Sequence, residues 1–439
     1  MMKLLKLLVG FLTVDAFFFS TTLTFTYGVN TKMMLAVVGL LFLAFDIARN
    51  RAFLVSRELM VTTAIAVLVS MCAFASTIYN NTVDDSYVTY FMSMWVWFSA
   101  AYAVVRILRA IHGKIDIDTV AAYIIVVSLC QGLLAVWADT YMPAKDFINR
   151  FVPGMGWVDR VDRLYGFGQT ACLDTGGLRF SIALVLCAYS IPRLVDKDKV
   201  GLVPVYFFAF LIISITGNMV ARTATVGMLL GLVYLILKSG LLSVQLGMKR
   251  IRALIWVAVV LVVVALGATV LYNTDANFHE NMRFGFEGFF SLFEKGEWDV
   301  SSNNKLKTMY VFPDNVKTWI IGDGYFNNPS YDKNYLGEYT DGYYMNTDVG
   351  YLRFLFYFGL LGLLSFVWLI VYSAKVCFQK FNDAKLLSLI LLALSFAIWL
   401  KVATDCFFIF AVLMSVAYVR DILPATEMSE EENLDEDSL

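Results

Sequence analysis

A polar loop passes into an apolar segment at Asn346-Thr347-Asp348-Val349-Gly350-Tyr351-Leu352-Arg353, and the apolar segment continues through residues 354–372. Asp348 ends the longest polar segment of the chain, and Arg353 follows five residues later, inside the apolar segment. Because a helix rises about 1.5 Å per residue, Arg353 lies within the part that faces lipid. A cation is costly there unless it has a partner or a function. The stretch therefore predicts a membrane helix with an acid and a base at its mouth.

The composition is that of a polytopic membrane protein. Of 439 residues, 59% are hydrophobic and 15% are aromatic, and the mean hydropathy is +0.69. A soluble domain of this length would be far less apolar. The formal net charge of −2 identifies no partner, and the sequence contains no basic patch typical of nucleic-acid binding. The six cysteines fall mostly in apolar segments, so we expect no disulfide framework.

Apolar windows of about spanning length predict an all-α fold with about twelve transmembrane helices. These windows are Leu4–Phe25, Met33–Phe45, Leu59–Tyr79, Val88–Leu108, Thr119–Tyr141, Thr175–Leu194, Leu202–Thr216, Thr223–Leu237, Leu254–Tyr272, Val349–Ser373, Lys385–Leu400 and Ala403–Val419. Near the last two windows, Lys401 and Asp405 lie four residues apart. We expect them to pair on one helix face, and the alternative is a proton or ion path.

The distribution of Lys and Arg predicts the orientation of these helices. If the N-terminus is cytoplasmic, the short inner connections hold more than half of the 34 basic residues, and the short outer ones hold almost none. Both termini are then cytoplasmic. The predicted parts are a membrane region 1–272 with an outer loop at 142–174, a large outer loop 273–348, a membrane region 349–420 and a disordered acidic tail 421–439.

The large outer loop contains two recognisable segments. Residues 303–316 mix basic and apolar side chains, which predicts a helix at the membrane surface. Gly322-Asp323-Gly324-Tyr325 is expected to form a tight turn. A lone Gly-x-Gly outside a strand–turn–helix unit does not indicate a nucleotide site.

Four arginines fall near the predicted outer face, where arginine is not needed to fix topology. Arg163 precedes the sixth predicted helix, and Arg179 lies about one turn inside it. Arg222 begins the eighth helix and Arg353 lies inside the tenth. A guanidinium group donates hydrogen bonds in a planar fork that suits phosphate, so convergence of these residues favours a pyrophosphate-linked lipid. The alternative for each is a snorkelling or ion-paired arginine.

Asp348 is the acid best placed to act with these arginines. Its carboxylate can accept a proton from a sugar hydroxyl as a general base, or it can cap the helix that follows; the residues leave both roles open. Tyr351 can stack on a sugar ring, although tyrosine is common at any membrane interface. His112 and His279 have no partner at metal-ligand spacing, so we expect no metal and no other cofactor.

These features together resemble the O-antigen polymerase and ligase superfamily, and the Wzy-type polymerases in particular. The resemblance covers nearly the whole chain and includes a large outer loop late in the sequence. Its short motifs are Arg-Leu-x-Gly from Arg163, Arg-Thr-Ala from Arg222, Trp319-Ile320-Ile321-Gly322-Asp323-Gly324, and Thr347-Asp348-x-Gly350-Tyr351-Leu352-Arg353 before a Gly-rich span. The resemblance implies a GT-C-like, metal-independent glycosyltransferase of the bacterial inner membrane.

Such an enzyme transfers the growing glycan from undecaprenyl pyrophosphate to a sugar hydroxyl of the next lipid-linked repeat unit, at the periplasmic face. The resemblance makes Arg163 and Arg222 pyrophosphate binders, Asp348 a base or acceptor-orienting group, and Arg353 a second phosphate or sugar contact. Arg179 is a candidate from topology alone. The implied partners are the lipid-linked oligosaccharide, membrane lipids and a chain-length regulator.

Two alternatives stay open. The related ligases carry a histidine just before the corresponding Tyr-Leu, whereas this chain has Asn346-Thr347-Asp348, which favours a polymerase over a ligase or another lipid-linked glycan transferase. The alternative from another class is a transporter or flippase of lipid-linked sugar. A transporter more often places its site at mid-membrane on broken helices, so the polar mass of the late loop favours an enzyme.

Overall fold

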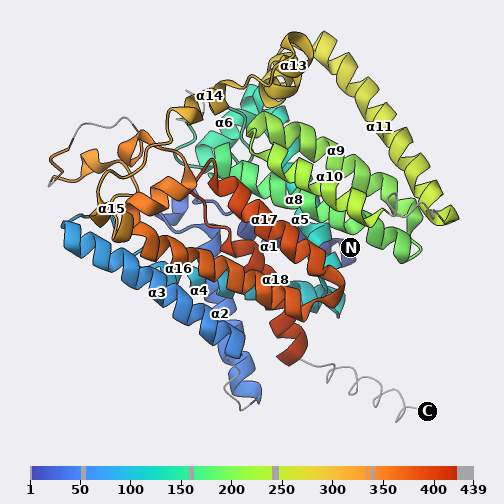
Figure 1. Ribbon diagram of the computed structural model, residues 1–439. Helices are drawn as coiled ribbons and strands as arrows, with labels where there is room; N and C mark the ends of the chain where they lie inside the picture. Colours follow the sequence, from blue (N-terminus) through green and yellow to red (C-terminus); the bar gives the residue numbers. More distant parts are fainter. Residues whose placement is uncertain are drawn as a thin grey trace.

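The structure is mainly helical over the residues that it describes, which are 2–50, 56–156, 158, 163–239, 247–333, 335–337 and 342–422 of a computed structural model (Figure 1). Within these ranges, extended pairing is limited to the isolated bridges Thr22–Asn30 and Tyr165–Cys172. The predicted all-α fold is therefore confirmed for this part of the chain. Most of the predicted acidic tail, residues 423–439, lies outside it.

The main helices follow the predicted apolar windows. They are α1 (Met2–Phe18), α2 (Thr31–Asn50), α3 (Arg57–Asn80), α4 (Tyr90–His112), α5 (Ile117–Thr140), α8 (Leu173–Asp196), α9 (Val203–Val220), α10 (Ala224–Lys238), α11 (Met248–Thr274), α16 (Gly350–Lys380), α17 (Lys385–Trp399) and α18 (Phe407–Ile422). In the described ranges, nine are long and apolar enough to cross a membrane. The other three, α1, α10 and α18, have 17, 15 and 16 residues. The chain is thus a polytopic membrane protein.

Shorter helices lie in the two long connections that the sequence places outside the membrane. They are α6 (Met142–Phe151), α12 (Ala276–Gly285), α13 (Glu287–Lys295), α14 (Ser301–Lys307) and α15 (Val316–Ile320). The helix predicted over residues 303–316 is wrong beyond Lys307. Pro313 explains the interruption, because proline lacks a donor and disfavours helical geometry at the residue before it.

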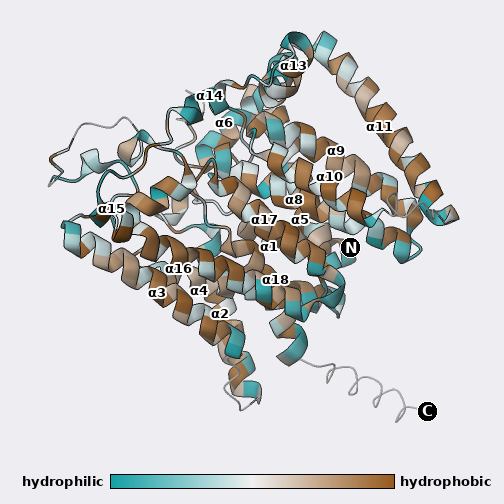
Figure 2. Cartoon of the chain, in the orientation of Figure 1, coloured by the Kyte–Doolittle hydropathy of each residue, from teal (hydrophilic) through white to brown (hydrophobic). Residues whose placement is uncertain are grey.

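Hydrophilic residues are concentrated toward two ends of the helix bundle, and hydrophobic residues dominate the helices between them (Figure 2). One end, called the loop end, carries α6 and α12–α15. Its contacts include Asn281–Asp139 (2.9 Å), Lys317–Asn80 (2.8 Å) and Thr24–Arg150 (2.9 Å). Contacts at the opposite end include Arg106–Asp46 (3.1 Å), Arg193–Asp118 (2.7 Å) and Lys380–Asp421 (2.8 Å). Each contact joins segments that the charge pattern places on one side of the membrane.

Helix α16 is broken near its first third, which the sequence did not predict. Phe358 (φ −131°, ψ 15°) and Gly359 (φ 67°, ψ −171°) leave the helical conformation. The turn at Gly322–Gly324 docks there: the amide of Asp323 donates to the Phe356 carbonyl (2.5 Å), and that of Gly324 donates to the Tyr357 carbonyl (3.1 Å). With φ of +85° and +75° at its two glycines, this segment is the predicted tight turn. The turn satisfies carbonyls that the break would otherwise leave unpaired.

The α17–α18 connection corrects another prediction. Lys401 and Asp405 do not pair on a helix face, because α17 ends at Trp399 and α18 begins only at Phe407. Lys401 lies 3.8 Å from Asp174 instead. Asp405 accepts hydrogen bonds from the Tyr90 hydroxyl (3.1 Å) and from the backbone amide of Phe407 (2.9 Å). The connection therefore presents its lysine and its aspartate to different neighbours.

Candidate functional site

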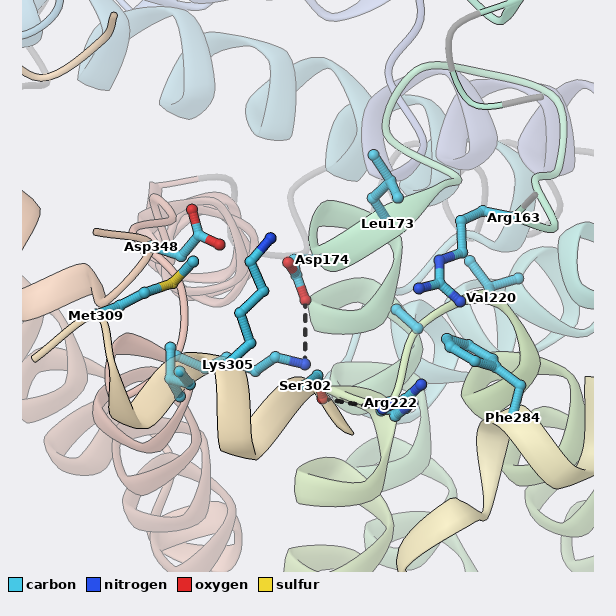
Figure 3. A pocket seen from close by; sticks show the side chains of 13 residues that line it. Arg163, Leu173, Asp174, Val220, Arg222, Phe284, Ser302, Lys305, Met309 and Asp348 are labelled. Atoms are coloured by element: carbon cyan, nitrogen blue, oxygen red, sulfur yellow. Dashed lines mark hydrogen bonds and ion pairs between the residues drawn. The ribbon is translucent and has the colours of Figure 1, made fainter. Parts of the chain in front are cut away.

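A cationic cavity of about 180 Å³ opens at the loop end (Figure 3). It lies between the start of α8, the α9–α10 turn, helices α12 and α14, the α17–α18 connection and the residues before α16. Its charged lining consists of the cations Arg163, Arg222, Lys305 and Lys401 and the carboxylates Asp174 and Asp348. The positive groups outnumber the negative ones two to one. Such a lining favours an anionic ligand.

The turn between α9 and α10 fixes the direction of Arg222. Thr223, the next residue, is buried: its hydroxyl donates to Asp174 (3.3 Å) and its carbonyl accepts from the Ser181 hydroxyl (3.0 Å). On α9, the Asn218 side-chain oxygen accepts from the Thr225 hydroxyl (2.5 Å). These bonds tie the turn to α8 and α9. Arg222 is therefore held at the cavity by a rigid backbone.

The guanidinium group of Arg222 is well anchored. One nitrogen, Nη1, lies 2.6 Å from a Glu287 oxygen and 3.1 Å from each of the Ser301 and Ser302 hydroxyl oxygens. Its Nε has no hydrogen-bond partner among the described residues. The pKa of Arg222 is lowered chiefly by burial, with Glu287 acting in the opposite direction. The guanidinium group is thus fixed through Nη1, and its buried Nε is left without a hydrogen-bond partner in the described part of the chain.

Arg163 and Arg222 share one aromatic ring. The Cζ atoms of the two guanidinium groups lie 3.8 Å and 4.1 Å from the centre of the Phe284 ring. The nearby charge of Arg163 also contributes to the lowered pKa of Arg222. Ring contacts of this kind hold arginines in place without neutralising them. An anion bound beside the ring would relieve their mutual repulsion.

Asp348 presents a carboxylate to the same cavity. Its side chain is exposed there and makes no hydrogen bond or ion pair with another residue of the described ranges. Partial desolvation raises the pKa of Asp348, while Arg353, Lys305 and Lys401 act to lower it and Asp174 to raise it. A carboxylate with a raised pKa is a stronger proton acceptor than an ordinary aspartate.

The structure also bears on the capping role of Asp348. Helix α16 begins at Gly350, so the N-cap is Val349, and no side-chain capping bond is present there. The backbone around Asp348 is fixed by its neighbours, because the Thr347 hydroxyl donates to the Met309 carbonyl (2.7 Å). A Cβ atom at Gly350 would lie 2.6 Å from the Val402 carbonyl oxygen. Close packing on both sides thus positions Asp348, and its carboxylate makes no hydrogen bond or ion pair within the described ranges.

Lys401 and Lys305 line the cavity, and sequence reasoning did not select them as site residues. Burial is the main cause that lowers the pKa of Lys401, and Arg222 and Arg163 add to the lowering while Asp174 opposes it. A lysine on the predicted outer side of the membrane was the available signal for Lys401. Nothing in the sequence singled out Phe284, because its part in the cavity depends on the contacts of Arg163 and Arg222 with its ring.

Arg353, Arg179 and Tyr351 do not line this cavity. Arg353 is 4% exposed, donates to the Phe326 carbonyl (2.9 Å) and lies 3.3 Å from the Tyr343 ring centre. Arg179 is 5% exposed and donates to the carbonyls of Phe18 and Thr175. The Tyr351 hydroxyl donates to the Phe396 carbonyl (3.1 Å). These contacts hold helices and loop segments together, and the predicted substrate contacts of the three residues stay predictions.

No protein-family model, curated protein or solved structure matches this chain. Over the described ranges, no three His, Cys, Asp or Glu side chains gather as a metal site requires. The residues of the cavity can bind an anionic group at the arginines and accept a proton at Asp348, which lies on the opposite side of the cavity (Figure 3).

Proposed function

We propose that this chain is a membrane-embedded glycosyltransferase that polymerises lipid-linked repeat units of a surface polysaccharide. It transfers the growing glycan from undecaprenyl pyrophosphate to a sugar hydroxyl of the next repeat unit. The observation that carries the proposal is one cavity that holds Arg163 and Arg222 against a common ring and Asp348 as an unengaged carboxylate. The motif resemblance to the Wzy-type polymerases adds the reaction class.

The proposed chemistry uses the two sides of the cavity for different tasks. The acceptor hydroxyl attacks the anomeric carbon of the donor glycan, and Asp348 takes the hydroxyl proton as the new bond forms. The bond between that carbon and the pyrophosphate oxygen breaks, and its electron pair leaves with undecaprenyl pyrophosphate. Arg163 and Arg222 stabilise the growing negative charge of this leaving group, with Lys305 and Lys401 adding to the positive field.

The proposal includes a location. The Lys and Arg bias of the short connections supports a periplasmic loop end and cytoplasmic termini. The pyrophosphate-linked donor then reaches the cavity from the outer leaflet of the inner membrane. A GT-C-like architecture is part of the same proposal.

Elongation by the purified protein tests this function. The protein is reconstituted in liposomes with the lipid-linked repeat unit, once alone and once together with a lipid A core, and the products are separated by length. A ladder of polymers is expected. Transfer that occurs only onto a lipid A core would identify a ligase, and translocation of the lipid-linked unit without elongation would identify a flippase; either result would overturn the proposal.

A further inference from the structure

A second, larger cavity lies beside the cationic one and is almost entirely apolar. Its volume is about 470 Å³, and residues of α5, α9, α11 and α12 line it. Its lining includes Leu133 and Trp137 of α5, Ile212 and Met219 of α9, and Leu271 of α11. We call this space the α11 groove. Its lining contains no Lys or Arg.

The α11 groove faces the surroundings of the protein because α11 packs loosely. Ala253 is the only buried residue of this 27-residue helix, which runs along the edge of the bundle (Figure 1). Val263 and Leu271 line the groove and are still 60% and 47% exposed. An apolar space that opens to a bilayer is filled by lipid chains, since an empty one would forfeit dispersion contacts. The apolar lining and the exposure of the groove therefore suit a lipid chain.

The depth of the groove matches one leaflet. Along α9 its lining runs from Phe208 to Met219, close to the loop end of that helix. At about 1.5 Å of rise per residue this is roughly 16 Å, about half of a hydrocarbon core of about 30 Å. A chain in the groove thus belongs to a lipid whose head lies at the loop end.

The head end of the α11 groove adjoins the cationic cavity. Met219 lines the groove, and Val220, the next residue, lines the cationic cavity. Helix α12 does the same, with Phe278 and Asn281 on the groove and Phe284 between the two arginines of the cationic cavity. The two spaces are thus lined by neighbouring residues of α9 and α12, which puts the anion site and the apolar groove within reach of one amphiphile.

We propose that the α11 groove binds the isoprenoid chain of the pyrophosphate lipid whose head occupies the cationic cavity. The identity of the head rests on the proposed function, whereas the assignment of the groove rests on its apolar lining and on its closeness to the cationic cavity. Bilayer phospholipids are the competing source of a chain. The adjoining cluster of cations favours a pyrophosphate over the singly charged phosphodiester of a phospholipid.

Gly267 offers a direct way to block the groove. It lines the groove, and a Cβ atom added to it would meet no other atom within 4 Å. Gly267→Trp should therefore fill the space without disturbing the packing. Val263→Trp is a second blocking variant on an exposed position, and Leu266→Trp is the matched control, because Leu266 is 63% exposed and does not line the groove.

The test measures the dissociation constants of inorganic pyrophosphate, farnesyl pyrophosphate and undecaprenyl pyrophosphate for the full-length protein in lipid nanodiscs. In the wild type and in Leu266→Trp, affinity should rise with chain length. In Gly267→Trp and Val263→Trp, undecaprenyl pyrophosphate should bind about tenfold more weakly while inorganic pyrophosphate binds as before, since helix and lipid-chain contacts in a bilayer contribute modestly.

The outcomes separate this inference from the proposed function. Wild-type affinity for undecaprenyl pyrophosphate in both blocking variants would overturn the groove assignment and leave the headgroup site intact. A phospholipid that co-purifies in the groove and is not displaced by undecaprenyl pyrophosphate would also overturn it. If the wild type binds none of the three pyrophosphates, the proposed function fails together with the groove.

Discussion

Replacement of Arg222 by alanine should abolish polymer formation while the protein stays folded in the membrane. The change removes a guanidinium group that is fixed by Glu287 at 2.6 Å and by two serines at 3.1 Å. It also removes one of the two cations on the Phe284 ring. The α9–α10 turn should survive, because the bonds of Thr223 and Thr225 hold it without Arg222.

The expected loss of turnover can be estimated from the proposed role of the Arg222 side chain. Loss of one preorganised group that stabilises developing negative charge lowers turnover by about 10²–10³-fold, or about 3–4 kcal/mol of transition-state stabilisation. Arg222→Lys should fall between the wild type and alanine, because it keeps the charge and loses the planar fork. Arg163 still contacts the Phe284 ring in this variant and can still bind the pyrophosphate, so binding of the donor should weaken less than turnover.

The assay is ladder formation by reconstituted protein, with Arg283→Ala as the control. Arg283 pairs with Glu294 at 2.8 Å and lies 4.9 Å from the Phe290 ring centre, so it makes contacts of the same kinds outside the cavity. The control should elongate at the wild-type rate. Wild-type polymer length and rate in Arg222→Ala, at equal protein level, would refute the assignment of the cavity.

Three further outcomes are expected. Elongation should decline as the pH falls through the pKa of Asp348, because a general base must be ionised, and partial desolvation raises this pKa above the ordinary 3.8. An elongation rate that stays flat down to about pH 4 would contradict this role. Gly359→Ala should destabilise the protein by at least about 1–3 kcal/mol in thermal unfolding, since the φ of +67° suits glycine and the new Cβ would lie 2.2 Å from the Ile320 carbonyl oxygen. The control, Gly267→Ala, should cause no such loss of stability. Lys317→Met removes a 2.5 Å bond to Asp323 and should increase hydrogen exchange of the Gly322–Gly324 turn; unchanged protection would show that the turn is held without this lysine.

The sequence predicted the end of the helix bundle at which the candidate site residues lie, but it did not predict which residues each of them contacts. Charge bias and hydropathy placed Arg163, Arg222 and Asp348 at one end of the helices, and the structure brings them to one cavity. The same argument placed Arg179 and Arg353 at that end, where both turn into packed protein. Position along a membrane helix gives depth, but the direction of a side chain depends on which helices pack around it.

Two irregular backbone segments explain why the sequence predicted neither the place of Lys401 in the cavity nor the break in α16. Lys401 reaches the cavity because the chain leaves the helix after Trp399, and spacing alone made the pair with Asp405 look plausible. The break at Phe358–Gly359 depends on donors from the remote turn at Asp323. Local propensity does not contain such long-range hydrogen bonds, so a continuous apolar window predicted a continuous helix.

The most direct test of the central claim is a paired measurement on Asp348→Asn, which nearly preserves side-chain size and removes the proton acceptor. Binding of undecaprenyl pyrophosphate and elongation of the lipid-linked repeat unit are measured on the same preparation. The proposed base role predicts donor affinity within about twofold of the wild type, since a neutral amide leaves the arginine site in place, together with loss of the polymer ladder. A ladder of wild-type length and rate from Asp348→Asn would contradict it.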